Sequence, residues 1–246
     1  MVALGSSNSE DGEYMAGVIT HLVVADEMLK SLPEGTINQK GLFYLGSFAP
    51  DAVHARENYI RAYKKHSHFR DDILDSDFEL EENYAIYKKR LIDFIIRHQD
   101  YNNPLIDLYR GYVVHILTDE LFMLSIRNEF SKSLKEVGIE QSNPLFYETI
   151  VTDLHRNDML LVNQYDRMKD IKIILEQAAV YPVEDYISEQ ELSISIEWLL
   201  QQHFYTPMES LQPVYISSQR MQEFIKYSTS EIINRLSGSG ALPKML

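Results

Sequence analysis

The feature that most constrains the fold is residues 111–122, GYVVHILTDELF, near the middle of the chain. Almost every side chain in this stretch is apolar, which predicts a helix that is buried on all sides. The stretch nevertheless contains His115 and Asp119, and their four-residue spacing places both side chains on one face of the helix. Because a buried, unpaired carboxylate is strongly destabilising, Asp119 must have a partner inside the protein.

Two interpretations of this pair are open at this point. The histidine and the aspartate can form a hydrogen-bonded pair, or a neutral imidazole and a carboxylate can bind one divalent metal ion together. The choice depends on whether other parts of the chain supply further ligands. Gly111 lies one turn before His115 on the same face, so we expect a second element to pack closely there.

The composition limits the kind of site that this helix can carry. The chain has no cysteine, which excludes disulfides and thiolate sites, so a metal must be held by histidine and carboxylate. The formal net charge of −14 disfavours nucleic acid or an anionic membrane as a bulk electrostatic partner. No run approaches the roughly 20 apolar residues of a transmembrane helix, and the N-terminus lacks a signal-peptide pattern, so we expect a cytoplasmic protein.

The length and the residue pattern predict one helical domain over residues 15–237. Residues 1–14 are expected to form a disordered leader and residues 238–246 a flexible tail. Helical periodicity and few Gly or Pro residues predict an all-α fold, a compact bundle of about seven to nine helices. The expected helices are 16–32, 41–46, 78–99, 104–136, 143–168, 170–180, 188–203 and 217–236.

Local signals mark the ends of several of these helices. Asn38 is expected to cap helix 41–46, and Ser188 with Glu191 has the spacing of a capping box. His98 is expected to be an exposed cation at the end of helix 78–99. Residues 52–77 are expected to form an irregular loop, and loops of this length are usually functional or disordered.

Other histidines and aspartates accompany the central pair. His21 lies on a small or apolar strip of the first helix, Asp51 follows Pro50 where the second helix ends, and His68 lies in the long loop. Each also has a structural alternative, as a core histidine, a helix cap or an incidental loop residue. Four more residues are kept as possible additional ligands: His54, His66, His155 and Asp158.

These segments resemble those of the zinc-dependent phospholipase C family. Residues 46–51, GSFAPD, resemble the family segment that ends in a metal-binding Asp, and residues 67–72, SHFRDD, resemble its His-Phe segment followed by acidic residues. Gly111-x-x-x-His115-x-x-x-Asp119 resembles the His-x-x-x-Asp pair whose Asp bridges two metals. Thr20-His21 is similar to the family's early His ligand. The matches span about residues 16–122, in the family's order.

The resemblance implies a helical bundle of the zinc-dependent phospholipase C type. Three family features are absent: a Trp ligand at the N-terminus, a His at the position of Ser125, and a later His-x-x-x-Glu pair. We therefore expect one or two Zn²⁺ ions rather than three, with Mn²⁺ or Fe as alternatives. The implied metal ligands are His21, Asp51, His68, His115 and Asp119.

The implied activity is phosphodiester hydrolysis by metal-activated water, with Asp51 doubling as general base. The substrate would be a small phosphoester or a lipid headgroup. Two other interpretations are open. A relative of the same fold that binds a metal or ligand without catalysis would also explain the absent ligands. An HD-type phosphohydrolase uses scattered His and Asp as well, but it requires an adjacent His-Asp pair, and no such dipeptide occurs here.

Overall fold

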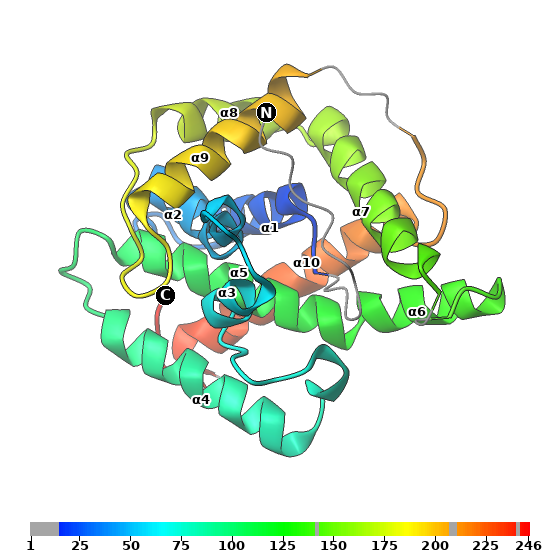
Figure 1. The fold of residues 1–246 in the computed structure, drawn as a ribbon. Helices are drawn as coiled ribbons and strands as arrows, with labels where there is room; N and C mark the ends of the chain where they lie inside the picture. The colour runs from blue at the N-terminus through cyan, green and yellow to red at the C-terminus, as the bar shows by residue number, and fades with distance from the viewer. Residues whose placement is uncertain (1–14, 141–142, 207–210, 240–241) are drawn as a thin grey trace.

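The structure is a computed structural model that describes residues 15–140, 143–206, 211–239 and 242–246. These residues form the predicted all-α bundle, and their one β feature is an isolated bridge between Val183 and Ile187 (Figure 1). The predicted leader, 1–14, lies outside the described residues. The elements in chain order are α1 (Val18–Ser31), α2 (Lys40–Gly46), η1 (Ala49–Ala55), α3 (Arg61–Ser67), η2 (Asp75–Asp77), α4 (Glu81–His98), α5 (Ile106–Leu124), α6 (Ile126–Glu136), α7 (Leu145–Gln164), α8 (Met168–Gln177), α9 (Glu189–Leu200), η3 (Gln201–Tyr205), α10 (Ser218–Asn234) and η4 (Arg235–Ser239).

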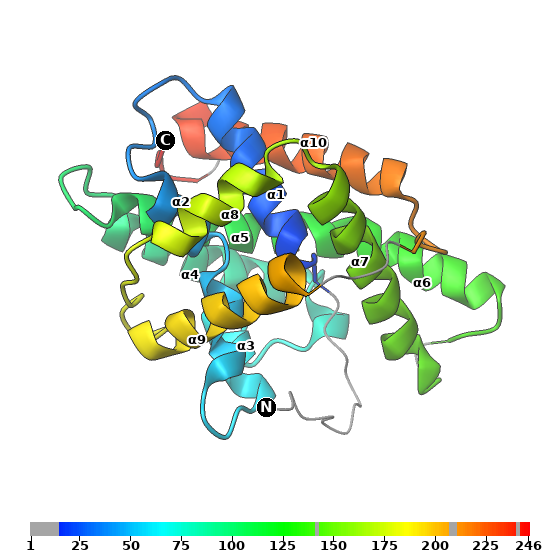
Figure 2. The ribbon, with the colours of Figure 1, turned by 90° about the horizontal axis from the view of Figure 1, so that it is seen from above.

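Helix α5 is the central element of the bundle (Figures 1 and 2). Every residue from Ile106 to Met123 is buried, which explains why the sequence of this helix has no polar face. Helices α1, α2, α4 and α10 and the short helix η1 all pack against it. Ionisable side chains on such a helix are tolerated only where the surrounding elements supply partners.

Helices α2 and α5 cross at two glycines, as the sequence predicts for Gly111. A Cβ atom on Gly111 would lie 2.1 Å from the carbonyl oxygen of Phe43, and one on Gly46 would lie 2.0 Å from that of Leu108. Since no side chain fits at either position, the two backbones touch. The crossing brings Ser47, just after α2, against the turn of α5 that carries His115.

The predicted helix over 104–136 is wrong, because it is broken at Ser125 into α5 and α6. The φ and ψ of Ser125 are −129° and −80°, which are not helical, and its hydroxyl donates a hydrogen bond of 2.6 Å to the carbonyl oxygen of Leu121. Such a local bond competes with the helical hydrogen-bond ladder. The irregular loop predicted over 52–77 is also wrong, because this range holds the end of η1 and all of α3 and η2.

The start of α2 is capped from α5 rather than by the side chain of Asn38. The carboxylate of Asp107 accepts hydrogen bonds from the backbone N–H groups of Asn38 and Gln39, at 2.9 and 2.7 Å. A tertiary contact has therefore replaced the predicted local cap. The capping box of Ser188 and Glu191 at the start of α9 is confirmed.

Two segments that were predicted to be exposed or flexible pack against the body. The ring of His98 is buried and stacks on that of Tyr109, with 3.9 Å between centroids. Burial lowers the pKa of His98 to about 4, so this side chain is neutral at pH 7 and not the predicted cation. In the predicted tail, Met245 is buried, and its carbonyl oxygen accepts a 2.7 Å hydrogen bond from Nε of Arg110. The end of the chain is thereby tied to α5.

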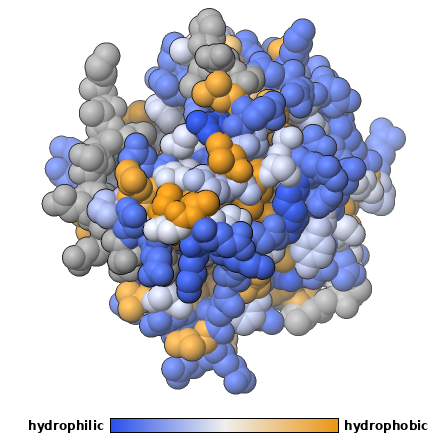
Figure 3. All heavy atoms as spheres, turned by 90° about the vertical axis from the view of Figure 1, so that its right-hand side faces the viewer, coloured by the Kyte–Doolittle hydropathy of each residue, from blue (hydrophilic) through white to orange (hydrophobic). Residues whose placement is uncertain are grey.

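The side of the molecule that carries α6 and α7 is mostly hydrophilic, with apolar side chains gathered near its middle (Figure 3). Within the ranges that the structure describes, no helix has the length and apolar character needed to cross a membrane.

Candidate metal centre

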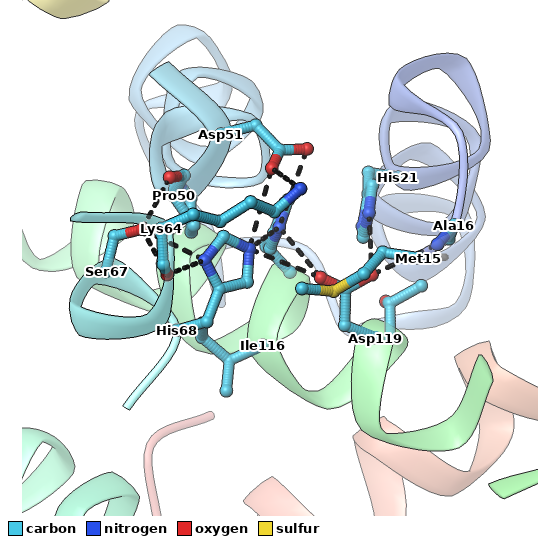
Figure 4. Close-up of polar contacts among 12 residues, drawn as sticks. Met15, Ala16, His21, Pro50, Asp51, Lys64, Ser67, His68, Ile116 and Asp119 are labelled. Atoms are coloured by element: carbon cyan, nitrogen blue, oxygen red, sulfur yellow. Dashed lines mark hydrogen bonds and ion pairs between the residues drawn. The ribbon is translucent and has the colours of Figure 1, made fainter. Parts of the chain in front are cut away.

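Five side chains from four segments converge beside the middle of α5 (Figure 4). They are His21 of α1, Asp51 of η1, His68 at the end of α3, and His115 and Asp119 of α5. Their possible ligand atoms form two groups that share His115: one with His21 and Asp119, the other with Asp51 and His68. Within each group the atoms lie within 4.8 Å of one another. The structure thus brings together all five residues of the predicted ligand set.

His68 is positioned by the way α3 ends. Phe69, the next residue, has a φ of +60°, a left-handed conformation that is uncommon for a residue with a side chain. Its N–H bonds the carbonyl oxygen of His66 at 3.1 Å, and the N–H of Arg70 bonds that of Lys65 at 2.8 Å. The two bonds form a Schellman motif, which usually has glycine at this position. A strained residue thus lies next to a candidate ligand, as is common at functional sites.

Backbone carbonyl groups orient two of the imidazoles. Nδ1 of His115 lies 2.9 Å from the carbonyl oxygen of Ser47, and Nδ1 of His68 lies 2.8 Å from that of Lys64. A carbonyl oxygen can only accept, so each Nδ1 carries the proton and each neutral ring presents a lone pair at Nε2. The two Nε2 atoms are 3.2 Å apart. Two lone pairs this close repel each other unless a proton or a metal ion lies between them, and both rings have the orientation that metal ligands have.

The carboxylate of Asp119 contacts both ligand groups. Its Oδ1 lies 3.2 Å from Nε2 of His21 and accepts a 3.2 Å hydrogen bond from the N–H of Ala16. Its Oδ2 lies 3.2 Å from Nε2 of His115 and 3.4 Å from Nε2 of His68. The ring of His21 stacks on that of His115, with 3.8 Å between centroids. Asp119 is therefore the one carboxylate that all three imidazoles approach.

Several buried ligand atoms of the cluster have no hydrogen-bond partner among the described residues. They are Nδ1 and Nε2 of His21, Oδ2 of Asp119 and Oδ1 of Asp51, of which the last has an ion-pair partner in Lys64 at 3.0 Å. The approaches of 3.2 to 3.4 Å around Asp119 Oδ2 and His21 Nε2 lack the alignment of a hydrogen bond. Buried polar atoms are almost always satisfied in folded proteins, so a cluster of exceptions needs an explanation. A cation bound at the centre would supply one.

The protonation states of His21, His68 and Asp119 suit a cation, whereas the surroundings of His115 favour its protonated form. Burial lowers the pKa of His21 and of His68, so both rings are neutral near pH 7. Burial also disfavours the charged forms of His115 and Asp119, but their mutual attraction outweighs it. The attraction of Asp119 raises the pKa of His115. The attraction of His21 and His115 holds the pKa of Asp119 well below its usual range. Neutral imidazoles and ionised carboxylates are the forms that bind metals.

Lys64 belongs to the centre and was missed by the sequence reasoning. Its ammonium nitrogen lies 3.0 Å from Oδ1 of Asp51, and its side chain is only 12% exposed. Burial favours the protonated form of Asp51, but Lys64 and the nearby histidines outweigh it and hold the pKa of Asp51 below its usual range. Lys64 and His68 are one helical turn apart. Recognition of helix 61–67 in the sequence would have placed them on one face.

Three of the four additional ligand candidates belong to neither ligand group. The ring of His54 packs on Tyr59, with 4.6 Å between centroids. His66 pairs with Asp71 at 3.0 Å. His155 lies beside another histidine, His203, at 5.8 Å between ring centroids. Each of these rings has a neighbour outside the five-residue cluster.

The fourth, Asp158, caps α1 instead of joining the ligands. Its carboxylate accepts hydrogen bonds from the N–H groups of Ile19 and Thr20 and from the hydroxyl of Thr20, at 3.0 to 3.2 Å. A Cβ atom on Gly17 would lie 2.4 Å from this carboxylate, so the chain can approach it only as glycine. Burial raises the pKa of Asp158 to about 6 despite these bonds. Asp158 thereby fixes the first turn of the helix that carries His21.

Comparisons of the chain with protein-family models, with curated proteins and with solved structures find no significant match. The functional conclusion therefore depends on the geometry of the cluster and on the motifs that compose it.

Proposed function

We propose that this protein is a metal-dependent phosphoesterase of the phospholipase C type, which hydrolyses a phosphodiester with metal-activated water. The observation that carries the proposal is the set of buried ligand atoms on His21 and Asp119 that lie around Nε2 of His115 and have no hydrogen-bond partner among the described residues. Leaving such atoms unsatisfied costs stability, whereas a divalent cation would satisfy them together. The segments that supply these atoms are the ones that resemble the family.

The donor set suits Zn²⁺ best. Imidazole nitrogens and carboxylate oxygens without a thiolate are ordinary zinc ligands, and the same donors accept Mn²⁺ or Fe. His21, His115 and Asp119 would hold one ion, and Asp51 and His68 extend the centre on the other side of His115. When bound, the ion supplies Lewis acidity and lowers the pKa of a coordinated water.

The residues of the chain hold the ligands in fixed orientations. The carbonyl oxygens of Ser47 and Lys64 fix the two rings that face each other, and the N–H of Ala16 fixes one oxygen of Asp119. Such contacts behind metal ligands typically change metal affinity or activity by about 10- to 100-fold. Asp51 is better suited to ligation than to the role of general base, because the neighbouring ammonium keeps its pKa low and makes its carboxylate a weak proton acceptor.

A non-catalytic metal-binding relative is the second candidate. It is favoured by the depth of the centre: the side chains of His21, His68, His115 and Asp119 are at most 5% exposed, and that of Asp51 is 17% exposed. A substrate would have to reach the centre from the side of Asp51. The small phosphoester or lipid headgroup expected from the sequence would place only its phosphate group there.

Metal content and activity distinguish these candidates. The purified protein, loaded with Zn²⁺ or Mn²⁺ and dialysed, should retain about one or two ions per chain and hydrolyse a chromogenic phosphodiester. His115→Ala and Asp119→Asn should lose both properties, whereas His66→Ala, a surface control, should keep both. Retained metal without hydrolysis would favour the non-catalytic candidate. Absence of bound metal would refute the proposal, as would hydrolysis that survives both site substitutions.

A further inference from the structure

Lys64 places a positive charge inside the second ligand group. Its ammonium nitrogen lies 3.0 Å from Oδ1 of Asp51, which is itself 3.6 Å from Nε2 of His68 (Figure 4). Asp51 is the only carboxylate in this group, whose other members are His68 and His115. The carboxylate that belongs to this group alone is therefore already paired with a cation, whereas Asp119 is shared with the first group.

The backbone restricts where this ammonium can go. Lys64 lies on α3, and its carbonyl oxygen accepts hydrogen bonds from Nδ1 of His68 at 2.8 Å and from the hydroxyl of Ser67 at 3.0 Å. The side chain of Lys64 is slightly more buried than that of Asp51, at 12% against 17% exposed. The ammonium group of Lys64 therefore has little room to move away from Asp51 into solvent.

The charges of the cluster favour one metal ion over two. The centre contains the two carboxylates Asp51 and Asp119 and three imidazoles. The positive charge of one divalent ion and the ammonium together already exceeds the negative charge of the two carboxylates. A second ion on Asp51, at an ordinary ligand distance of about 2 Å, would lie within about 5 Å of the ammonium and be strongly repelled by it.

We propose that the ammonium of Lys64 takes the place of a second metal ion. The centre then binds one divalent ion, on the side of His21, His115 and Asp119, and Lys64 provides the second positive charge that faces the phosphate group of a substrate. This inference rests on the proposed metal-dependent function and specifies the number of ions, which neither the motifs nor the ligand geometry determines.

Metal stoichiometry after removal of the charge tests this inference. Lys64→Met keeps the length of the side chain without its charge, Lys64→Arg keeps the charge, and Lys65→Met changes the neighbouring lysine of α3 as a matched control. Each protein is dialysed against Zn²⁺, and the bound metal is counted. We expect one ion in the unmodified protein, in Lys64→Arg and in Lys65→Met, and two in Lys64→Met.

Electron paramagnetic resonance of the Mn²⁺-loaded proteins provides a second readout. One ion produces an uncoupled Mn²⁺ spectrum, whereas two ions held next to each other in the cluster produce a spin-coupled one. Two ions in the unmodified protein would overturn the inference, even if Lys64→Met fails to fold. One ion in a folded Lys64→Met would overturn it as well. Both results leave the proposed function standing, whereas absence of metal in the unmodified protein refutes both.

Discussion

Gly111→Ala should damage the metal centre although the residue is not a ligand. The new methyl group would lie 2.1 Å from the carbonyl oxygen of Phe43, 2.8 Å from the backbone nitrogen of Ser47 and 2.9 Å from Cα of Gly46. All three are backbone atoms, so no side-chain rotation can relieve the contacts. Helices α2 and α5 must separate by about 1.3 Å, the difference between 2.1 Å and the 3.4 Å at which ordinary contact begins.

The cost follows from this displacement. Overpacking costs about 1–3 kcal/mol, and a clash with backbone belongs at the upper end of that range. Replacement of glycine by alanine within a helix stabilises the helix by about 1 kcal/mol, which offsets part of this cost. The net loss of about 2 kcal/mol should lower Tm by about 4–8 °C for a chain of this size. Because Ser47 moves with α2, its carbonyl oxygen should no longer orient His115, and Zn²⁺ affinity should fall by about 10- to 100-fold.

Thermal unfolding by circular dichroism and Zn²⁺ titration against a competing chelator measure the two effects. Gly41→Ala is the matched control, since it lies in the first turn of α2 and the nearest atom to its new methyl group would be Cβ of Ala178 at 3.1 Å. It should leave Tm within a few degrees and Zn²⁺ affinity unchanged. If Gly111→Ala melts like the control and binds Zn²⁺ as tightly as the unmodified protein, the helix crossing does not position His115 and the reasoning fails.

Two other predictions concern pH and metal removal. The pKa of Asp158, raised from 3.8 to about 6 in the folded protein, means that the folded state keeps a proton which the unfolded state releases as pH rises from 4 to 6. The unfolding free energy should therefore fall over this range, relative to that of Asp158→Asn, by up to about 3 kcal/mol. If denaturant unfolding gives the same pH dependence for both proteins, the prediction is wrong. Zn²⁺ at about 100 times its dissociation constant should stabilise the protein by about 2.7 kcal/mol, and a chelator should reverse the effect. His115→Ala should show no Zn²⁺-dependent shift in Tm, and a shift equal to that of the unmodified protein would place the metal elsewhere.

Three of the five clustered residues were predictable because each breaks a local pattern, whereas Asp51 and His68 were assigned from the family resemblance. His115 and Asp119 interrupt a helix that is otherwise apolar, and His21 lies on a small or apolar strip of its own helix. Burial of such groups is costly, so a polar residue in an apolar pattern indicates a partner in the interior. For that reason the convergence of these side chains could be predicted without knowledge of how the helices pack.

The residues that were misjudged depend on contacts between distant segments. At the end of a helix, His98 has the sequence pattern of an exposed cation, and only its packing on Tyr109 makes it a buried, neutral ring. Asp158 resembles a ligand in sequence, but its carboxylate bonds Ile19 and Thr20, which lie 139 and 138 residues earlier in the chain. The break at Ser125 has no Gly or Pro to signal it. Local patterns cannot report such tertiary contacts.

The part of the chain without site motifs has a definite role in the centre. The carboxylate of Asp158 on α7 caps the helix that carries His21, and the hydroxyl of Ser195 on α9 donates a 3.2 Å hydrogen bond to the carbonyl oxygen of Ala52, next to Asp51. In both contacts a side chain from the second half of the chain bonds a backbone group of the first half. Many residue types, at many positions in a sequence, can make such a bond. A metal ligand in this chain must be a histidine or a carboxylate. A side chain that only holds a ligand-bearing segment in place needs to reach a carbonyl or an N–H group. The second half of the chain can therefore hold the centre in place without leaving a sequence motif.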